Sequence, residues 1–236
     1  MIDLHTHTLF SDGELIPAEL TRRAAFAGYR ALAMTDHVDL SNLDFILPRL
    51  LKVAADLSQA WGLTVLAVVE LTHIPTAQIA AAAAQARQLG AQIIVCHGET
   101  IVEPVAAGTN LAALAADIDI LSHPGLLTAE EAALAAQRGV FLEITTRKGH
   151  SLTNGHVVRM AQAAGAKLVV NNDAHAPGDL VSLEMARKIA FGAGLDEAGF
   201  AACQRNSEEL VKKALALAQG RTESAQGASH APLRGN

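Results

Sequence analysis

Seven short apolar runs, each followed by a helical pattern, constrain the fold of this chain more than any other feature. The runs are rich in Ile, Val, Leu and Ala and predict strands over 2–5, 31–35, 64–69, 92–95, 118–121, 140–144 and 167–170. Helical periodicity predicts helices over 17–28, 45–61, 76–89, 107–116, 128–138, 154–164 and 181–193. Strands that are apolar throughout and alternate with helices are typical of a parallel sheet covered by helices. We therefore expect an α/β fold.

Local signals support these boundaries and define one domain. Pro17 stands where a helix begins, and Thr128 with Glu131 has the spacing of a capping box. The run 206–209 is expected to cap a last helix that ends near Gln219. Residues 1–220 would then form one domain, since α/β barrels of this size are ordinary single units. Residues 221–236 lack periodicity and are expected to be a disordered tail.

Composition excludes several classes of protein. The net charge of −6 and an aromatic content of 3% argue against a surface for long nucleic acids, which is usually basic and uses stacking. No apolar run reaches the roughly 18 residues of a membrane span, and the first residues lack the pattern of a signal peptide, so none is expected. Cys96 and Cys203 form no CxxC pattern, which favours a reducing, cytoplasmic location. Cys96 is expected to pack behind the sheet rather than to bind a metal ion.

Imidazoles and carboxylates recur where the predicted strands end. His5 and His7 are two residues apart on a strand, so their rings project from the same face. The carboxyl ends of parallel strands meet at one rim, and mixed imidazole and carboxylate ligands suit Zn, Mn and Fe. Nine groups exceed the needs of one ion but would hold two or three, with Glu70 as a bridge. The nine predicted ligands are His5, His7, Asp12, His37, Glu70, His97, His123, Asp173 and His175.

The motifs that contain these residues resemble those of the PHP (polymerase and histidinol phosphatase) superfamily of metal-dependent phosphoesterases. They are DLHTHTLFSDG at 3–13, TDH at 35–37, the Glu that ends VLAVVE at 65–70, CHG at 96–98, SHPG at 122–125 and NDAH at 172–175. The resemblance implies a distorted (β/α)7 TIM-like barrel of parallel strands with a trinuclear centre. His5, His7, Glu70 and Asp173 would hold one ion, Glu70, His97 and His123 a second, and Asp12, His37 and His175 a third.

Other residues at the same rim are candidates for contact with the substrate. Arg147 follows the sixth strand and is predicted to clamp a phosphate group, because its guanidinium offers a bidentate fork. Asp12 or His175 would help to protonate the leaving group. His73 and His150 are expected to be ordinary loop residues, with contact with the substrate as the alternative. Glu99 and Glu103 are candidates to shape the pocket, and Asp36 would orient a ligand. His156 and His230 are expected to lie outside the site.

The resulting functional prediction is a phosphoric monoester hydrolase. Its partner would be a small phosphorylated substrate, either histidinol-phosphate-like or a nucleotide monoester, and the sequence leaves the oligomeric state open. Three alternatives stand beside this prediction. They are a phosphodiesterase or nuclease for short nucleotides, an amidohydrolase, and a non-catalytic regulatory domain that binds metal. The paired Asp173 and His175 favour the phosphoesterase over the amidohydrolase.

Overall fold

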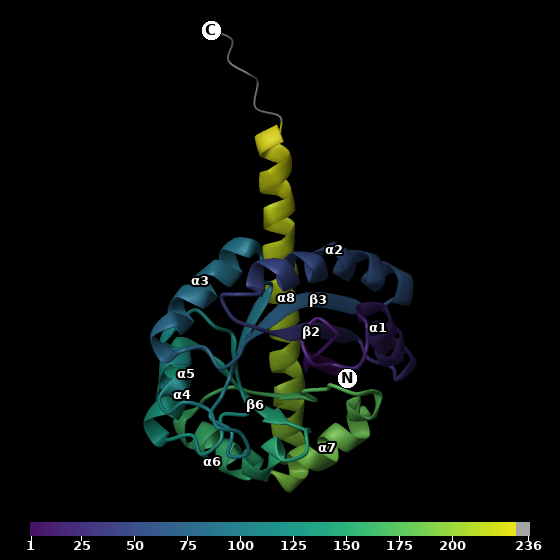
Figure 1. The fold of residues 1–236 in the computed structure, drawn as a ribbon. Helices are drawn as coiled ribbons and strands as arrows, with labels where there is room; N and C mark the ends of the chain where they lie inside the picture. Colours follow the sequence, from purple (N-terminus) through teal and green to yellow (C-terminus); the bar gives the residue numbers. More distant parts are fainter. Residues whose placement is uncertain (230–236) are drawn as a thin grey trace.

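Seven parallel strands form the centre of the molecule. The computed structural model describes residues 1–229, with side chains as far as Arg221. The strands lie in sequence order and every neighbouring pair is parallel, so the predicted α/β TIM-like barrel is confirmed (Figure 1). They are β1 (Ile2–Thr6), β2 (Ala31–Val38), β3 (Thr64–Leu71), β4 (Ile93–His97), β5 (Ile120–Ser122), β6 (Phe141–Thr145) and β7 (Leu168–Asn171).

A helix follows each strand and covers its outer side (Figure 1). Thr128 and Glu131 form the predicted capping box at the start of α5. Glycine follows α3, α5 and α6 in the left-handed conformation that ends a helix. The helices are α1 (Pro17–Phe26), α2 (Leu43–Trp61), α3 (Ile79–Leu89), α4 (Thr109–Ala115), α5 (Ala129–Arg138), α6 (Asn154–Ala164) and α7 (Leu183–Gly192).

The barrel is nearly closed between its first and last strands. Within the described residues, one isolated bridge, between Thr6 and Ala174, joins this edge of the sheet. The Leu4 backbone N–H donates to the Asn171 side-chain oxygen at 2.9 Å, across 167 residues of sequence. This side-chain hydrogen bond therefore replaces one of the backbone hydrogen bonds that a complete strand pair would make, and it holds β1 against β7.

Alternation along the strands divides the core into two apolar layers. Leu4, Val68 and Val95 belong to the layer inside the barrel, whereas Val69 and Cys96 pack outward against the helices. Cys96 therefore packs behind the sheet, as expected from its neighbour His97 at the rim. The strands are apolar on both faces because each face has its own layer to fill.

The last helix differs from the sequence prediction. α8 (Glu197–Ser229) runs without a break through 206–209, where we expected a helix to begin. The Asn206 amide donates to the Leu168 carbonyl at 2.8 Å, and the Ser207 hydroxyl donates to the Cys203 carbonyl one turn earlier at 3.2 Å. These side chains therefore make bonds within a helix and to the sheet, although the same residue types often cap helices.

The far end of α8 also extends beyond its expected limit. The helix passes Gln219 and continues to Ser229, into the segment predicted to be a disordered tail. Residues 230–236, including His230, lie outside the described residues. The predicted domain boundary after residue 220 thus stays a prediction.

α8 covers the amino ends of the strands. Lys213 Nζ lies 2.6 Å from Asp119 Oδ1, just before β5, and Leu210 and Ala214 pack into the interior layer. Figure 1 shows this helix crossing behind the barrel. The loops at the carboxyl ends thus lie on the opposite side, where ligands bind in such barrels. None of the helices in the described part has the length and apolarity needed to cross a bilayer.

Candidate metal centre

Eight of the nine predicted ligands converge at the carboxyl ends of the strands in overlapping groups. Within each group, every residue offers one ligand atom within 4.8 Å of the others. The groups are His7–Asp12–His37–His175, His5–His123–Asp173 and His5–His7–Glu70. The ninth predicted ligand, His97, is grouped with His73 and Glu103.

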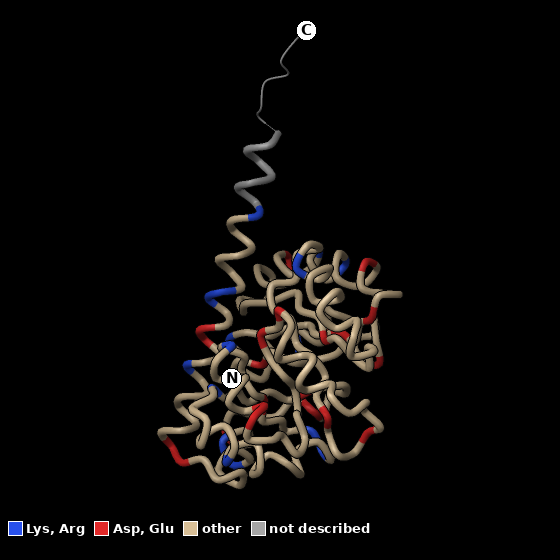
Figure 2. Tube along the Cα trace, turned by 90° about the vertical axis from the view of Figure 1, so that its left-hand side faces the viewer, with Lys and Arg blue, Asp and Glu red and all other residues tan. Residues whose placement is uncertain are grey.

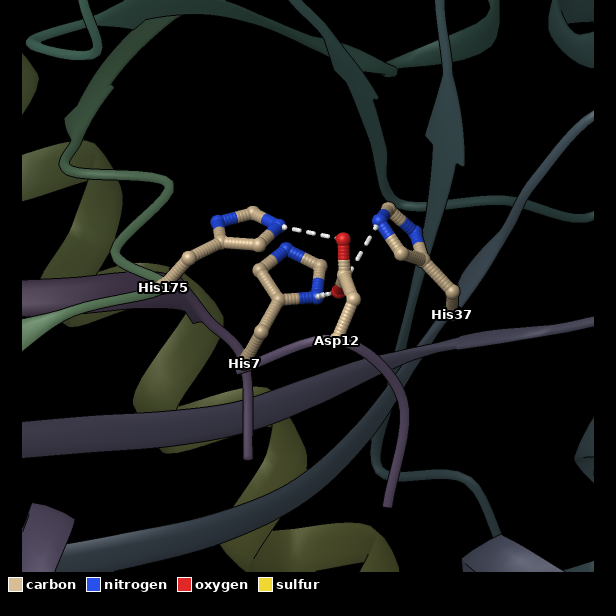
Figure 3. Close-up of side chains that lie close together, drawn as sticks. All are labelled: His7, Asp12, His37 and His175. Carbon is tan, nitrogen blue, oxygen red and sulfur yellow. Dashed lines mark ion pairs between the residues drawn. The ribbon is translucent and has the colours of Figure 1, made fainter. Parts of the chain in front are cut away.

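The Asp12 carboxylate lies between three imidazole rings (Figure 3). Its Oδ2 is 3.2 Å from His175 Nε2, and its Oδ1 is 3.5 Å from His37 Nε2 and 3.8 Å from His7 Nδ1. Burial would raise the pKa of Asp12, but hydrogen bonds from His175 and His37 outweigh it and hold that pKa far below its ordinary value. Asp12, His37 and His175 are the set implied for the third ion, and His7 joins them here.

Asp36 holds the loop that carries Asp12. Its Oδ1 accepts hydrogen bonds from the backbone N–H groups of Thr8 at 2.8 Å and Ser11 at 3.2 Å, and from the Ser11 hydroxyl at 2.8 Å. A Cβ at Gly13 would lie 2.4 Å from the His7 carbonyl oxygen, so this turn also requires a glycine. Asp36 therefore orients a predicted ligand through its loop, without acting on its neighbour His37.

Glu70 occupies the middle of the centre and is fully buried. Its Oε1 lies 3.3 Å from His5 Nε2 and 3.7 Å from His123 Nε2, while its Oε2 lies 2.7 Å from His37 Nδ1. Ser122 donates to Oε1 at 2.7 Å. Burial opposes ionisation, but His5 and His37 hold the pKa of Glu70 well below its usual range. One carboxylate thus faces histidines from three strands, as a bridging ligand would.

Two predicted ligands adopt strained backbone conformations. Asp173 has φ of 53° and His123 has φ of 25°, and His73 on the same rim has φ of 52°. These are the non-glycine residues with positive φ among those described. Such conformations cost about 1–3 kcal/mol each and cluster at functional sites. Asp173 Oδ1 is thereby placed 3.2 Å from His7 Nε2.

The donor atoms fit divalent metal ions. His5 Nε2, both ring nitrogens of His7 and Nδ1 of His123 are buried without a hydrogen-bond partner among the described residues. Each such atom costs about 1–3 kcal/mol unless something binds it. Ligand atoms of a tetrahedral zinc ion lie roughly 3.3 Å apart, given bonds of about 2.0 Å. The distances of 3.2–3.7 Å around Glu70 and Asp173 match this spacing.

Glu143 supports His5 from behind and was missed by the sequence analysis. The buried His5 Nδ1 donates to Glu143 Oε2 at 2.8 Å, and the Asn171 amide donates to the same oxygen at 2.9 Å. Burial would lower the pKa of His5, but Glu143 and the other carboxylates hold it well above its ordinary value. The available signal was a carboxylate in the middle of an otherwise apolar strand, where charged residues are rare unless paired.

The predicted clamp Arg147 enters the same site. Its Nη1 donates to the Asp173 carbonyl at 3.1 Å and lies 2.7 Å from His175 Nδ1, while its Nε is 3.6 Å from Asp173 Oδ2. With Asp12, His37 and His123 it lines a cavity of about 40 Å³ over the centre. Its neighbour Lys148 is exposed.

A larger pocket adjoins this cavity. Its volume is about 390 Å³, and its lining includes Asp12, His37, His73, His97 and Glu103. Among the described residues, no ion pair joins His97 to Glu70, although the rings of His97 and His123 are 4.5 Å apart. The His97 Nε2 instead lies 3.1 Å from Glu103 Oε2.

The remaining histidines divide as follows. His150 is buried, with Nδ1 2.8 Å from the Thr100 hydroxyl and Nε2 3.3 Å from Glu103 Oε1. His156 lies outside the site, as expected, with Nε2 2.7 Å from the Leu127 carbonyl.

Glu103 also contacts His97. A hydrogen bond from His97 is the main cause that lowers the pKa of Glu103 to about 2.

Comparison with solved structures supports the fold. A Listeria monocytogenes protein assigned as a histidinol phosphatase matches with a TM-score of 0.56 and 13% identity, over 76% of this chain and 97% of that chain. An amidohydrolase matches with a TM-score of 0.59 and 12% identity, over 90% and 74% of the two chains. At these identities the similarity concerns the fold alone.

Comparison of sequences identifies the family. The uncharacterized protein MJ1295 of Methanocaldococcus jannaschii is 48% identical over 195 residues, which cover 82% of this chain and 89% of the relative. The family model of the PHP domain matches residues 3–117. That stretch contains the first six of the nine predicted ligands, as far as His97. The chain therefore belongs to the PHP domain family.

Proposed function

We propose that this protein is a metal-dependent phosphomonoesterase that acts on a small phosphorylated metabolite. Family membership and the ligand groups support a metal-dependent hydrolase. The observation that carries the phosphate assignment is the presence of Arg147 in the lining of the cavity formed by Asp12, His123 and Asp173. A guanidinium beside metal ligands suits an anion with several oxygens, because it binds two of them at once.

The proposed cofactors are two or three divalent ions of Zn, Mn or Fe. The inner ions would be held by His5, His7, His97, His123, Glu70 and Asp173. Asp12, His37 and His175 would hold the outer one, nearest the pocket. When bound, the ions would polarise the phosphoryl oxygens and lower the pKa of the attacking water. Burial and neighbouring histidines hold the pKa of His7 well below its ordinary value, so its ring is neutral and can act as a ligand.

His175 would control the position of Arg147. The Asp173 carbonyl, 3.1 Å away, is the natural acceptor for a proton on His175 Nδ1 when Nε2 binds an ion. Arg147 Nη1 lies 2.7 Å from the same Nδ1 and can only donate. A protonated Nδ1 offers Arg147 no acceptor on His175 and competes with it for the Asp173 carbonyl, so Arg147 would turn from His175 to the phosphate oxygens.

Asp12 and His175 would deliver a proton to the leaving alcohol. The Asp12 side chain is 54% exposed and lines both the small cavity and the larger pocket. It therefore lies on the path that an alcohol would take from the phosphorus to solvent. We assign protonation of the leaving oxygen to a water molecule positioned by this pair, whose facing atoms are 3.2 Å apart.

The pocket favours a small substrate. A volume of about 390 Å³ is within the range of small-molecule sites. Figure 2 shows Lys and Arg at scattered positions on the outer helices and α8. Binding of a long nucleic acid would use a continuous basic surface. A histidinol-phosphate-like compound or a nucleotide monoester is the proposed substrate class, and the cytoplasm the proposed location.

A substrate panel would test this proposal. Metal-free protein is supplied separately with Zn²⁺, Mn²⁺ or Fe²⁺ and assayed on sugar phosphates, nucleoside monophosphates, histidinol phosphate and short phosphodiesters. We expect hydrolysis of monoesters, its loss in Asp12→Asn, and its retention in the control Glu14→Gln, an exposed carboxylate on the same loop. Protein that binds the ions but hydrolyses no monoester would refute the proposal. Hydrolysis of diesters alone would establish the phosphodiesterase instead.

A further inference from the structure

A groove with mostly apolar walls lies between α1 and α2, which pack side by side (Figure 1). Its volume is about 360 Å³. We call it the α1–α2 groove, and its lining residues are Phe10, Ile16, Pro17, Ala18, Arg49, Lys52, Val53 and Leu57. None of them lines the 390 Å³ pocket or the 40 Å³ cavity at the metal centre. The groove is therefore separate from the site described above.

The loop that carries Asp12 forms one wall of the α1–α2 groove. The Leu9 backbone N–H donates to the Leu15 carbonyl at 3.0 Å and closes this loop at its base. Phe10 and Ile16, which follow these two residues in the chain, both line the groove. The Ile16 side chain is 52% exposed, although it is large and apolar. The fold thus leaves apolar surface uncovered at the base of a closed loop, as small-molecule sites often do.

Two cationic side chains of α2 line the same groove. Arg49 and Lys52 are exposed, and neither forms an ion pair among the described residues. They are three residues apart on one helix, so their side chains are neighbours on its surface. The Arg49 guanidinium carbon lies 3.5 Å from the centre of the Phe45 ring, and Nη1 donates to the Phe45 carbonyl. This stacking fixes the guanidinium, whose other N–H groups can still donate to an anion.

The two cations distinguish the α1–α2 groove from a larger one. A groove of about 740 Å³ between α2 and α8 is lined by Ala54 and Leu215 among others, and Arg221 is its cation. The Arg221 guanidinium donates to the carbonyls of Arg87 and Gln88 at 2.9 Å each, so the protein itself already engages it. The cations of the α1–α2 groove have no acidic partner, and an anion attached to an apolar body complements both its charge and its walls.

We propose that the α1–α2 groove binds a small, soluble carboxylate with an apolar body, of the kind of a medium-chain fatty acid. The chain would lie against Ile16, Val53 and Leu57, and the carboxylate would lie between Arg49 and Lys52. A volume of about 360 Å³ is within the range of small-molecule sites. Exposed ion pairs contribute little, so the chain supplies most of the affinity and the carboxylate selects the ligand. The inference goes beyond the proposed function, which uses none of these residues.

Decanoate is the probe, and decanol, which has the same chain length without the charge, is the matched ligand control. Both are titrated by calorimetry into the full chain as purified. We expect decanoate to bind about 10-fold more tightly than decanol, because each of two exposed ion pairs contributes up to about fivefold. The double variant Arg49→Gln/Lys52→Gln should lose this difference and bind decanol as wild type does.

A matched pair of variants locates the binding. Ala18→Glu places a carboxylate in the α1–α2 groove, at an exposed position in the first turn of α1 where an acidic residue is compatible with the helix. It should abolish decanoate binding. Ala55→Glu makes the same change at an exposed alanine of the groove between α2 and α8, and it should bind decanoate as wild type does. Thermal unfolding verifies that both variants fold.

Crystals soaked with decanoate show the ligand directly. We expect density along the α1–α2 groove with the carboxylate beside Arg49 and Lys52. Equal affinity for decanoate and decanol, unchanged binding in Ala18→Glu, or density at the metal centre or between α2 and α8 would overturn the inference. A dimer in sedimentation that Ala18→Glu dissociates would also overturn it, because a second copy would then cover the groove. Binding to phospholipid vesicles without binding of decanoate would overturn it in favour of a membrane surface. None of these measurements depends on phosphatase activity.

Discussion

Replacing Glu143 with Gln tests whether His5 is a metal ligand that depends on a buried carboxylate. Glu143 Oε2 accepts from His5 Nδ1 at 2.8 Å and from Asn171 at 2.9 Å, while its Oε1 has no partner among the described residues. Gln can place its carbonyl oxygen where Oε2 lies and keep both hydrogen bonds. The substitution therefore removes the negative charge with little change of shape.

The expected loss follows from the hydrogen bond to His5. A bond to a charged acceptor contributes about 1.5–3 kcal/mol, and one to a neutral acceptor about 0.5–1.5 kcal/mol. The midpoints of these ranges differ by about 1.25 kcal/mol, close to the roughly 1.4 kcal/mol that corresponds to a tenfold change in an equilibrium constant. Glu143→Gln should thus bind the ion at His5 about 10-fold more weakly, at the lower end of the 10–100-fold typical of such supporting residues.

Competition with a chelating dye measures this affinity, and thermal unfolding with and without metal provides a second readout. At equal free metal above saturation, the variant should lose about 1.4 kcal/mol of the stabilisation that metal provides. The exposed Glu14→Gln serves as control, because it changes the same charge on the same side of the barrel. Wild-type affinity for every ion in Glu143→Gln would refute the reasoning that Glu143 acts through His5.

Four further outcomes are expected. Arg147→Ala should lower kcat/KM for phosphomonoesters about 100-fold with unchanged metal content, and Arg147→Lys should recover only part, as kinetics with metal analysis would show. Gly98→Ala should cost about 3 kcal/mol in urea unfolding, because its Cβ would lie 2.3 Å from the Ser122 carbonyl oxygen. Gly192→Ala, with open space around it in α7, should add about 0.5 kcal/mol. Burial raises the pKa of Asp3 from 3.8 to about 7, so folded protein keeps this proton while unfolded protein releases it. The stability of metal-free wild type relative to Asp3→Asn should therefore fall as pH rises from about 4 to about 7, and a constant difference would contradict this.

The fold could be predicted from the sequence because its strands are buried on both faces. Each strand is then a continuous apolar run, and the expected and observed strands differ by a few residues at most. The largest extensions are at the carboxyl ends of β2, β3 and β4. There Asp36, His37 and Glu70 continue the strands although they interrupt the apolar pattern. The functional residues themselves thus obscured these boundaries.

Position in the chain predicted the site best where ligands lie on strands or shortly after them, whereas Asp12, six residues beyond β1, was predicted through its sequence motif. The seven strand ends meet at one rim, so the position of His5 or Glu70 in the chain fixes its position in space. Glu103 lies six residues beyond the end of β4, and spacing cannot tell which way such a loop turns. The predicted helix start at 206–209 was wrong for another reason. Asn206 and Ser207 are residue types that often cap helices, but here their side chains donate hydrogen bonds to the carbonyl oxygens of Leu168 and Cys203.

The nearly closed edge of the barrel gives the ligands a structural role as well. Among the described residues one isolated bridge, from Thr6 of β1 to Ala174 just beyond β7, joins the two ends of the sheet, yet His7 lies 3.2 Å from Asp173 across this edge. An ion bound between these residues would fasten the first strand to the last, which the sheet itself hardly does. During synthesis His7 emerges at the start and Asp173 after most of the chain. An ion can therefore bind between the two residues only when the barrel is nearly complete. Binding of this ion would thus indicate that the first and last strands of the barrel have come together.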